Sequence, residues 1–263
     1  MVKRMKKFLL DLVVIGNIRL HPLCYLLKLT SDRQLPEMIP GQFVEVRVDD
    51  SPKTFLRRPV SIHYLDKKNN ELWLLIQLVG EGTRRLSKCV TGDSLNVILP
   101  LGNGFSIPQA VEGAKLLLVG GGIGVAPLLY LGDTLKSIGY KPAFLLGVRT
   151  KEFLWQLDEF EKIGKVYVTT EDASLGEKGF VTHHSILRAE KYDKIYGCGP
   201  LPMMVAVAKY AKTAGIDCEV SLENKMACGI GACLCCVENT VRGNVCVCTD
   251  GPVFNINQLT WRI

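Results

Sequence analysis

Short apolar runs separated by Gly, Pro and Asp turns make up the first 108 residues of the chain. Each run has the length of a strand, and few stretches between the runs show helical spacing. Six short strands in succession predict a small antiparallel barrel. The expected strands are residues 9–15, 25–29, 42–48, 59–63, 72–77 and 95–99.

The pattern changes at residue 115, where the sequence KLLLVG is apolar without interruption. Leu128, Leu131 and Leu135 follow at helical spacing, which predicts a helix over 125–138. Strand-like and helix-like segments then alternate, and the strands are apolar on both faces, so this region predicts a doubly wound parallel sheet. Further strands are expected at 143–148, 165–169, 194–196 and 218–222, and further helices at 152–163, 180–189 and 202–214.

From about residue 223 the chain is rich in Cys and Gly and shows little periodicity. Such a segment does not fold on apolar burial alone, so we expect a metal to hold it. The predicted fold class is a β barrel plus an α/β domain, followed by a small C-terminal metal-binding segment. We expect the three parts to span residues 1–108, 109–222 and 223–263.

Composition indicates a globular protein, with 263 residues, 48% hydrophobic and 22% charged. The net charge of +6 is spread along the chain, apart from a basic start at Lys3, Arg4, Lys6 and Lys7. Because Asp11 interrupts the apolar stretch behind that start and no cleavage site follows, we expect a cytoplasmic protein. No apolar run is long enough to span a bilayer, and no basic stripe with interleaved aromatics indicates nucleic-acid binding.

Six of the ten cysteines lie between residues 228 and 248, which indicates a metal site and not a disulfide framework. In CGIGACLCC, Cys228, Cys233 and Cys236 have the C-x4-C-x2-C spacing of plant-type 2Fe–2S clusters. Cys246 and Cys248 are both available as the fourth ligand. The alternatives are a zinc knuckle, which prefers paired short spacings, and a loop of unliganded thiols.

The stretch KLLLVGGGIGVAPLL places a glycine-rich turn between a buried strand and a helix. Backbone amides in such a turn form an anion site suited to a pyrophosphate, so Gly120, Gly121, Gly122 and Gly124 are candidate nucleotide-binding residues. A merely tight turn is the alternative. A second turn, YGCGP with Cys198 and Gly199, follows a later strand and is expected at the same carboxyl edge.

The barrel region contains LRRPVSI, where Arg58 offers a fork for a phosphate and Ser61 a hydroxyl. Gly82 and Thr83 form an expected turn into a short helix. Taken alone, these residues are more typical of a surface arginine and a strand serine than of a phosphate site.

The barrel stretch LRRPVSI, the glycine-rich turns and the cysteine segment follow one another along the chain in the same order as in one known family. The chain resembles the ferredoxin–NADP reductase superfamily and, more closely, the electron-transfer subunits of dihydroorotate dehydrogenase B, which add a C-terminal 2Fe–2S segment. The resemblance covers essentially the whole chain. It rests on MACGIGACLCC and CTDGPVF, supported by LRRPVSI and GGGIGVAPLL.

This resemblance implies an FAD-binding barrel, a nicotinamide domain and a 2Fe–2S cluster. Cys235 adds a thiol that the family pattern does not require, and Val60 stands where the wider superfamily often has a flavin-contacting Tyr. The implied FAD contacts are Arg58, Pro59, Val60, Ser61, Leu75, Ile76, Gln77, Gly82 and Thr83, and the implied cluster ligands are Cys228, Cys233, Cys236 and Cys248.

The implied function is electron transfer from dihydroorotate oxidation to NAD, within pyrimidine biosynthesis. The resemblance places the substrate and an FMN in a separate catalytic subunit and implies a dimer of heterodimers, a heterotetramer. A related subunit of another NAD(P)H oxidoreductase complex and a non-catalytic redox sensor are the alternatives. NAD and NADP are not distinguished, since Arg149 either meets a 2′-phosphate or faces solvent.

Overall fold

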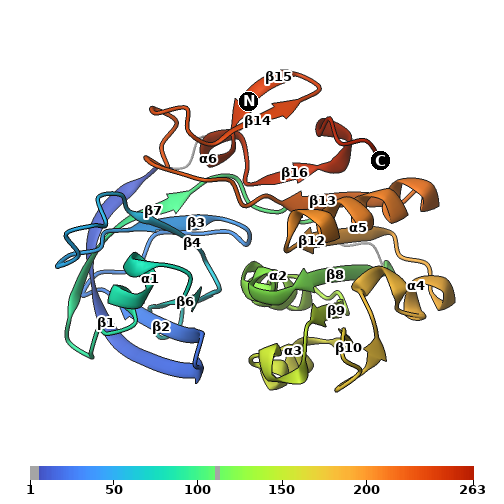
Figure 1. The fold of residues 1–263 in the computed structure, drawn as a ribbon, viewed down its shortest axis with the longest axis horizontal. Coiled ribbons are helices and arrows are strands. Elements are labelled where there is room, and N and C mark those ends of the chain that lie inside the picture. Colours follow the sequence, from blue (N-terminus) through green and yellow to red (C-terminus); the bar gives the residue numbers. More distant parts are fainter. Residues whose placement is uncertain (1–5, 110–112) are drawn as a thin grey trace.

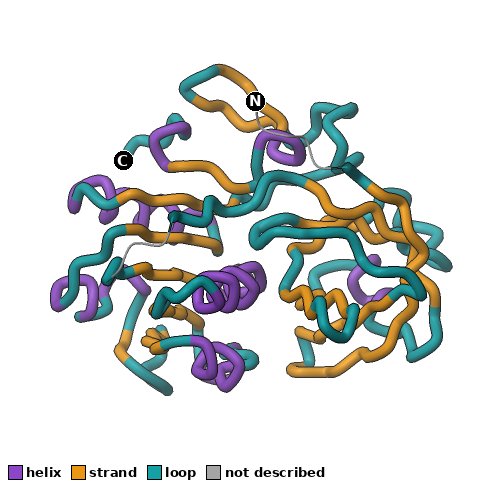
Figure 2. The backbone as a smooth tube through the Cα atoms, turned by 180° about the vertical axis from the view of Figure 1, so that it is seen from behind, coloured by secondary structure: helices purple, strands orange, loops and turns teal. Residues whose placement is uncertain are grey.

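The structure is a computed structural model that describes residues 6–109 and 113–263, so Lys3 and Arg4 of the basic start lie outside the described residues. Figure 1 shows an antiparallel sheet and a parallel sheet side by side, with the C-terminal segment lying across both. The view from behind in Figure 2 shows the same arrangement. Within the described ranges, no helix has both the length and the apolar character needed to cross a membrane.

The N-terminal body is a seven-stranded half-barrel in the order β4-β3-β7-β1-β2-β6-β5, and all its neighbouring strands are antiparallel. Inward-facing side chains such as Leu12, Val14, Val44 and Leu74 are fully buried in its core. All six expected strands form, which confirms the antiparallel barrel predicted from the sequence. The bounds are β1 (Phe8–His21), β2 (Cys24–Thr30), β3 (Phe43–Val46), β4 (Arg58–Ser61), β5 (Tyr64–Asp66), β6 (Glu71–Gln77), α1 (Glu81–Leu86) and β7 (Ser94–Leu101).

The second body is a seven-stranded sheet in the order β11-β10-β9-β8-β12-β13-β16, parallel throughout except for β16. Helices α2 and α3 cover one face and α4 and α5 the other (Figure 1), so the predicted doubly wound arrangement is confirmed. The bounds are β8 (Leu116–Gly121), α2 (Ala126–Ser137), β9 (Ala143–Val148), α3 (Leu157–Ile163), β10 (Lys165–Thr170), β11 (Glu177–Lys178), α4 (Ile186–Ala189), β12 (Lys194–Cys198), α5 (Leu201–Ala214) and β13 (Asp217–Ser221).

Two helices are shorter than the sequence pattern predicts. The helix expected at 152–163 begins only at Leu157, because Gln156 has a φ of 58°, a left-handed conformation that interrupts a right-handed helix. The helix expected at 180–189 is divided into a 3₁₀ turn and the short α4. His184 lies between them with extended backbone, and its Nδ1 accepts a hydrogen bond of 3.0 Å from the backbone N–H of Ile186. This local bond takes the place of a helical one.

The C-terminal segment is anchored to both bodies. Val247 and Phe254 are buried in the same core as Leu101 of the half-barrel and Val220 of the parallel sheet. The segment therefore buries more apolar surface than its weak periodicity predicts. Its elements are β14 (Val237–Thr240), β15 (Gly243–Cys246), α6 (Val247–Asp250) and β16 (Val253–Asn255), of which β14 and β15 form a hairpin and β16 pairs antiparallel with β13.

A fully buried histidine connects the two bodies. His63 follows β4, and its Nδ1 lies 2.7 Å from the carbonyl oxygen of Ala126 at the start of α2. Its Nε2 lies 2.8 Å from the side-chain amide of Gln156 before α3. Burial lowers the pKa of His63, so the ring is neutral at neutral pH and donates from Nδ1 to the Ala126 carbonyl. This contact fixes the half-barrel against the helices of the second body.

Candidate functional site

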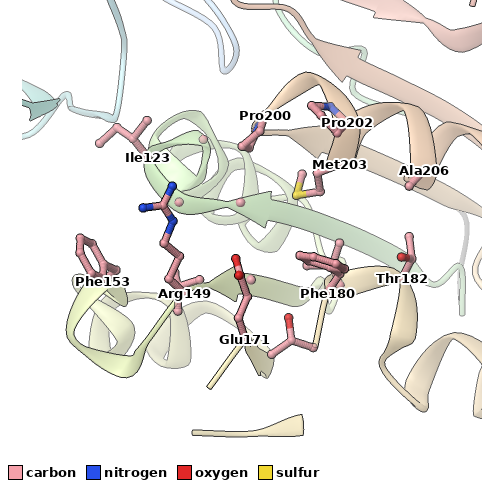
Figure 3. A pocket seen from close by; sticks show the side chains of 18 of the residues that line it. Ile123, Arg149, Phe153, Glu171, Phe180, Thr182, Pro200, Pro202, Met203 and Ala206 are labelled. Carbon is pink, nitrogen blue, oxygen red and sulfur yellow. The ribbon is translucent and has the colours of Figure 1, made fainter. Parts of the chain in front are cut away.

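A cavity of about 770 Å³ opens at the carboxyl ends of the parallel strands (Figure 3). Gly121, Gly122 and Gly124 line it after β8, and Gly199 lines it after β12. The two glycine turns expected at one edge of the sheet therefore do meet there. Gln77, at the end of β6, reaches the same cavity from the half-barrel.

The contacts between the two turns explain their glycines. A Cβ on Gly124 would stand 2.5 Å from the carbonyl oxygen of Cys198 and 2.5 Å from Gly199 Cα, so a side chain there would push the turns apart. Gly122 is different, because it has a φ of 54° and a Cβ there would meet no protein atom within 4 Å. Its free space belongs to the cavity, where a bound group would approach the backbone.

Two of the candidate residues in these turns do not line the cavity. A Cβ on Gly120 would meet Val125 and Leu128 inside the core, at 2.9 and 3.0 Å, so this glycine serves the packing of strand against helix. The Cys198 side chain is 1% exposed, and burial raises the pKa of its thiol well above the usual range. We infer that Cys198 contributes its backbone to the turn, and not a reactive thiolate.

The cavity wall contains two buried donors without a partner. Trp155 is 5% exposed and Thr169 fully buried, and neither Trp155 Nε1 nor Thr169 Oγ1 has a hydrogen-bond partner among the described residues. Buried polar groups are nearly always paired, so these two are exceptions, but neither atom is exposed to the cavity. Figure 3 shows the side chains of Arg149 and Glu171 directed into the same space.

These wall residues are only partly recognisable from the sequence. Arg149 and Glu171 follow β9 and β10 directly, at the carboxyl edge where ligands bind, and that position is the available signal. Trp155 lies in a loop that the apolar pattern assigned to a helix. Its place in the cavity depends on the left-handed turn at Gln156, which the pattern does not reveal.

A second, smaller cavity of about 300 Å³ lies on the half-barrel and brings together Arg58, Gly82 and Thr83. A Cβ on Gly82 would stand 3.0 Å from the Arg58 side chain, so the glycine lets that side chain lie against the turn. Thr83 Oγ1 accepts from the backbone N–H of Val79 at 3.1 Å and of Gly80 at 3.2 Å, which fixes the turn. The Arg58 side chain and the turn thus form one wall of this cavity, here called the Arg58 cradle, where a guanidinium fork is available to a phosphate group.

The remaining candidate flavin contacts are divided between two strands. Val60 is buried, Ser61 is half-buried and Pro59 is exposed, all on β4. Leu75 and Ile76 on β6 are buried, so only their backbone is available to a ligand. The structure therefore brings Arg58, Gly82 and Thr83 into one cavity and places Gln77 in the other.

The cysteines of the C-terminal segment form two close pairs. The backbone N–H of Cys233 donates to Cys228 Sγ at 3.4 Å, and that of Cys248 donates to Cys236 Sγ at 3.4 Å. No three Cys, His, Asp or Glu side chains in the described ranges are placed to hold a single metal ion. Four thiols in two pairs fit instead the donor set of a 2Fe–2S cluster, in which each of two irons takes two thiolates.

Backbone amides prepare Cys228 to bind as a thiolate. Burial by itself raises the pKa of its thiol, but N–H groups of Ile230, Cys233 and Ala232 point at the sulfur and lower the pKa to about 6. Burial and the neighbouring Cys236 thiol raise the pKa of Cys248 to about 12. A thiol with that pKa loses its proton only when a metal replaces it.

The two further thiols of the segment differ. Cys246 is half-buried and lies in hydrogen-bonding contact with the Cys236 thiol, and burial and that contact raise its pKa. Cys246 thus stays open as an alternative to Cys248, whereas the Cys235 thiol is exposed and makes no hydrogen bond in the described chain.

A buried carboxyl lies between the cluster loop and the flavin strand. Glu45 on β3 is fully buried, and neither of its oxygens has a partner in the described chain. Burial raises its pKa to about 7, although the Arg58 and Arg57 charges oppose that shift. A Cβ on Gly229 would stand 2.6 Å from Glu45 Cγ, so the glycine lets the loop close onto this side chain. Glu45 was not anticipated, and its only signal is an acidic residue in the apolar strand FVEV.

Comparison with known proteins places these features in one family pattern. The family model for the iron–sulfur cluster binding domain of dihydroorotate dehydrogenase B matches residues 223–260. An electron-transfer subunit of dihydroorotate dehydrogenase B (NAD(+)) from Lysinibacillus sphaericus is 44% identical over 223 residues, covering 83% of this chain and 86% of that one. The corresponding subunit from Fusobacterium nucleatum is 39% identical over 250 residues, covering 93% and 95%.

Solved structures show the same architecture. The chain is similar to a structure of the NADH-dependent reduced ferredoxin–NADP oxidoreductase, described for flavin-based electron bifurcation, with a TM-score of 0.85 and 30% identity. The similarity covers 95% of this chain and 90% of that one. A cytochrome P450 reductase from Amycolatopsis shares the fold, with a TM-score of 0.68 at 24% identity over 80% of this chain and 68% of that one.

Proposed function

The chain belongs to the family of electron-transfer subunits of NAD-linked dihydroorotate dehydrogenase B, and on this premise we propose that it carries electrons from a catalytic subunit through a 2Fe–2S cluster and FAD to NAD. The observation that carries the proposal is the presence of three sites in one chain: the nucleotide cavity, the Arg58 cradle and the paired cysteines. A flavin exchanges two electrons with a nicotinamide and single electrons with an iron–sulfur centre, so it connects the other two.

We assign the nucleotide to the larger cavity. The amides of Gly121, Gly122 and Gly124 would surround a pyrophosphate. A Cβ on Gly199 would stand 2.7 Å from Met203 Cε and 3.1 Å from Gly121 N, so this glycine lets the second turn pack against the first. Gly120 supports the first turn through the packing of strand against helix, and Cys198 contributes its backbone to the second turn.

The flavin is proposed to lie along β4 and β6, between the two cavities. Arg58, Gly82 and Thr83 would hold its phosphates, Pro59, Val60 and Ser61 would flank it on β4, and Leu75, Ile76 and Gln77 would offer backbone and amide contacts from β6. Because Gln77 also lines the larger cavity, a nicotinamide held there would meet the flavin at this residue.

The cluster is proposed to be bound by Cys228, Cys233, Cys236 and Cys248. The two N–H···S contacts and the position of Cys248 support this set. The resulting functional parts are residues 1–108 for FAD, 109–222 for NAD and 223–263 for the cluster. Gaps between secondary-structure elements support both boundaries, since β7 ends at Leu101, β8 begins at Leu116 and β13 ends at Ser221.

The relatives are named as subunits, so this chain has a catalytic partner. We propose that the partner contains FMN and the dihydroorotate site, that two heterodimers associate, and that the complex works in the cytoplasm in pyrimidine biosynthesis. Exposed Ile230 and Leu234 in the cluster loop are available to meet a partner.

Activity of the chain with and without its partner tests this function. The purified chain should oxidise NADH with an artificial acceptor and should not oxidise dihydroorotate. Adding the FMN-containing subunit should give dihydroorotate oxidation coupled to NAD. Dihydroorotate turnover by the single chain would contradict the proposed division of labour.

A further inference from the structure

His63 connects the strands proposed to flank the flavin with the glycine turn proposed to hold the nucleotide. It stands two residues after Ser61, the end of β4, and its backbone N–H donates to the carbonyl oxygen of Trp73 on β6. Its Nδ1 donates to the carbonyl oxygen of Ala126 at 2.7 Å, and Ala126 stands two residues after Gly124. One fully buried side chain thus spans the distance from β4 and β6 to the glycine turn.

The other ring nitrogen of His63 is also held. Its Nε2 lies 2.8 Å from the side-chain amide of Gln156, so contacts on both sides fix the orientation of the ring. Gln156 directly follows Trp155, which lines the nucleotide cavity. His63 itself does not line that cavity, so any influence on a bound nucleotide passes through these neighbours.

Reduction of a flavin by NADH depends on the distance and the angle between the two rings. In this step the C4–H bond of NADH breaks, and the hydrogen forms a bond to flavin N5 with both bonding electrons, which leaves NAD+ and a two-electron-reduced flavin anion. A displacement of about 1 Å between reacting groups can cost on the order of 100-fold in rate. The half-barrel is proposed to hold the flavin and the second body the nicotinamide, so contacts between the two bodies close to the site control this distance.

We infer that His63 is a positioning residue for hydride transfer. By holding the start of α2 against β4 and β6, it sets the glycine turn, and with it the nicotinamide, at a fixed distance from the flavin. The contact with Ala126 carries the effect because Ala126 is the first residue of α2 and adjoins the turn, whereas the contact with Gln156 keeps the ring oriented. The inference rests on the proposed function and deepens it, since His63 touches neither cofactor.

A second hydrogen bond between the two bodies supplies a matched control. Tyr130, one helical turn further along α2, donates from its hydroxyl to the carbonyl oxygen of Met38 in the half-barrel at 2.8 Å. Tyr130 is buried and does not line the nucleotide cavity. Tyr130→Phe therefore removes a buried contact of similar length between the bodies but leaves the contact at the glycine turn in place.

Stopped-flow reduction of the chain loaded with FAD and cluster measures the effect. At saturating NADH the limiting rate should fall about tenfold in His63→Leu, which loses both ring contacts. It should fall about threefold in Gln156→Gly, which loses one contact and keeps the left-handed backbone. His63→Asn should stay within about twofold of the wild type, because its amide N–H replaces the Nδ1 donor to Ala126. Tyr130→Phe should keep the wild-type rate.

Three further readouts separate positioning from binding and from stability. The charge-transfer absorbance of the complex, which reports overlap of the nicotinamide and flavin rings, should weaken in His63→Leu and persist in Tyr130→Phe. The dissociation constant of NAD should change by less than about twofold in both variants, since the loss is confined to the reaction step. Urea unfolding should show a similar loss of stability in the two variants.

Equal rates in His63→Leu and Tyr130→Phe overturn the inference, and so does a loss of rate that a higher NADH concentration restores. A rate in His63→Asn as low as that in His63→Leu also overturns it, because the contact with Ala126 would then not carry the effect. If His63→Leu does not retain FAD, Gln156→Gly is compared with Tyr130→Phe, and equal rates in these two overturn the inference. A wild-type flavin that NADH does not reduce contradicts the proposed function itself, whereas equal rates leave that function intact.

Discussion

The nucleotide cavity and the cluster loop both depend on glycine, but they keep their shapes in different ways. At the cavity, Gly124 is pressed between two turns that belong to the core of the parallel sheet. In the cluster loop, Gly229 and Gly231 have positive φ values, and neighbouring Ile230 and Leu234 are exposed. Core packing therefore surrounds the cavity turns, whereas the cluster loop combines packed glycines with exposed apolar side chains, and we expect its exposed part to depend on the group that its cysteines bind.

Among changes that test this difference between cavity and loop, replacing a cluster ligand should have the largest effect. Cys228→Ser and Cys233→Ser each remove one thiolate of a pair, so we expect the cluster to be lost and iron and sulfide to fall from about two per chain to near zero. Flavin content should not change, because the Arg58 cradle is a separate site.

Matched thiols supply the controls for that experiment. Cys235→Ser should keep the cluster, since the Cys235 thiol is exposed and does not belong to the proposed ligand set. Cys246→Ser should also keep it, and Cys248→Ser should lose it. A chain that binds stoichiometric zinc without iron, or that loses its cluster in Cys235→Ser, would show that the ligand set is wrong.

A change in the shape of the nucleotide cavity should slow the reaction with NADH without affecting the cluster. In Gly122→Val the new side chain would enter the free space beside the backbone, so reduction of the flavin by NADH should slow by on the order of 100-fold, or about 2.7 kcal/mol. FAD, iron and sulfide should remain. Stopped-flow absorbance measures the rate.

Gly139→Val separates this effect from backbone strain. Gly139 also has a positive φ and an open Cβ position, but it lies outside the cavity. Its φ of 97° lies outside the left-handed region that contains the 54° of Gly122, so the variant should carry at least as much strain and still keep the normal rate of flavin reduction. A normal rate in Gly122→Val would mean that the turn serves only the fold.

The cradle on the half-barrel should show an intermediate effect. Arg58→Ala removes a charged hydrogen-bonding group, so FAD binding should weaken by about 2 kcal/mol. Arg57→Ala is the control, because the Arg57 guanidinium donates to the backbone oxygen of Asn96 at 2.9 Å and does not line the cavity. Flavin content that stays constant as the Arg58 variant is diluted would refute the assignment.

The contact between the two bodies should show the smallest effect, and one that depends on pH. His63→Leu removes the hydrogen bond to Ala126, so the free energy of unfolding at pH 7.5 should fall by about 1 kcal/mol. Because burial lowers the pKa of His63, the unfolded chain takes up a proton below about pH 6.5 while the folded chain does not. The wild type therefore loses stability as pH falls from about 6.5, and the leucine variant lacks this loss.

Urea unfolding at pH 7.5 and pH 5.5 measures both chains. The stability difference between wild type and variant should narrow at the lower pH. A difference that stays constant would show that His63 titrates alike in the folded and unfolded chains.

The sequence pattern predicts the packed parts of this molecule better than the loops. Strand β9 has the predicted bounds, residues 143–148, because a run buried on both faces leaves one register available. The prediction of one continuous helix at 180–189 was wrong, because the His184 side chain forms a local hydrogen bond that hydrophobic spacing does not show. Trp155 and Glu45 owe their positions to a left-handed turn and to contact with a distant loop, so neither could be placed from spacing alone.

The cysteine spacing, in contrast, is local, and it identified a compact set of thiols without any knowledge of the fold. What it left open was the choice between Cys246 and Cys248, since both lie near Cys236. Two residues apart on the chain, they come from the end of β15 and the start of α6, and only the N–H···S contact of Cys248 separates them.

Anaerobic titration with NADH tests the central claim most directly, that electrons pass between nucleotide and cluster only through FAD. Visible absorption and electron paramagnetic resonance follow the flavin and the cluster separately. In the wild-type chain NADH should reduce both. In a chain freed of FAD, NADH should leave the cluster oxidised, and restoring FAD should restore its reduction. Reduction of the cluster by NADH in the flavin-free chain would contradict this order of transfer.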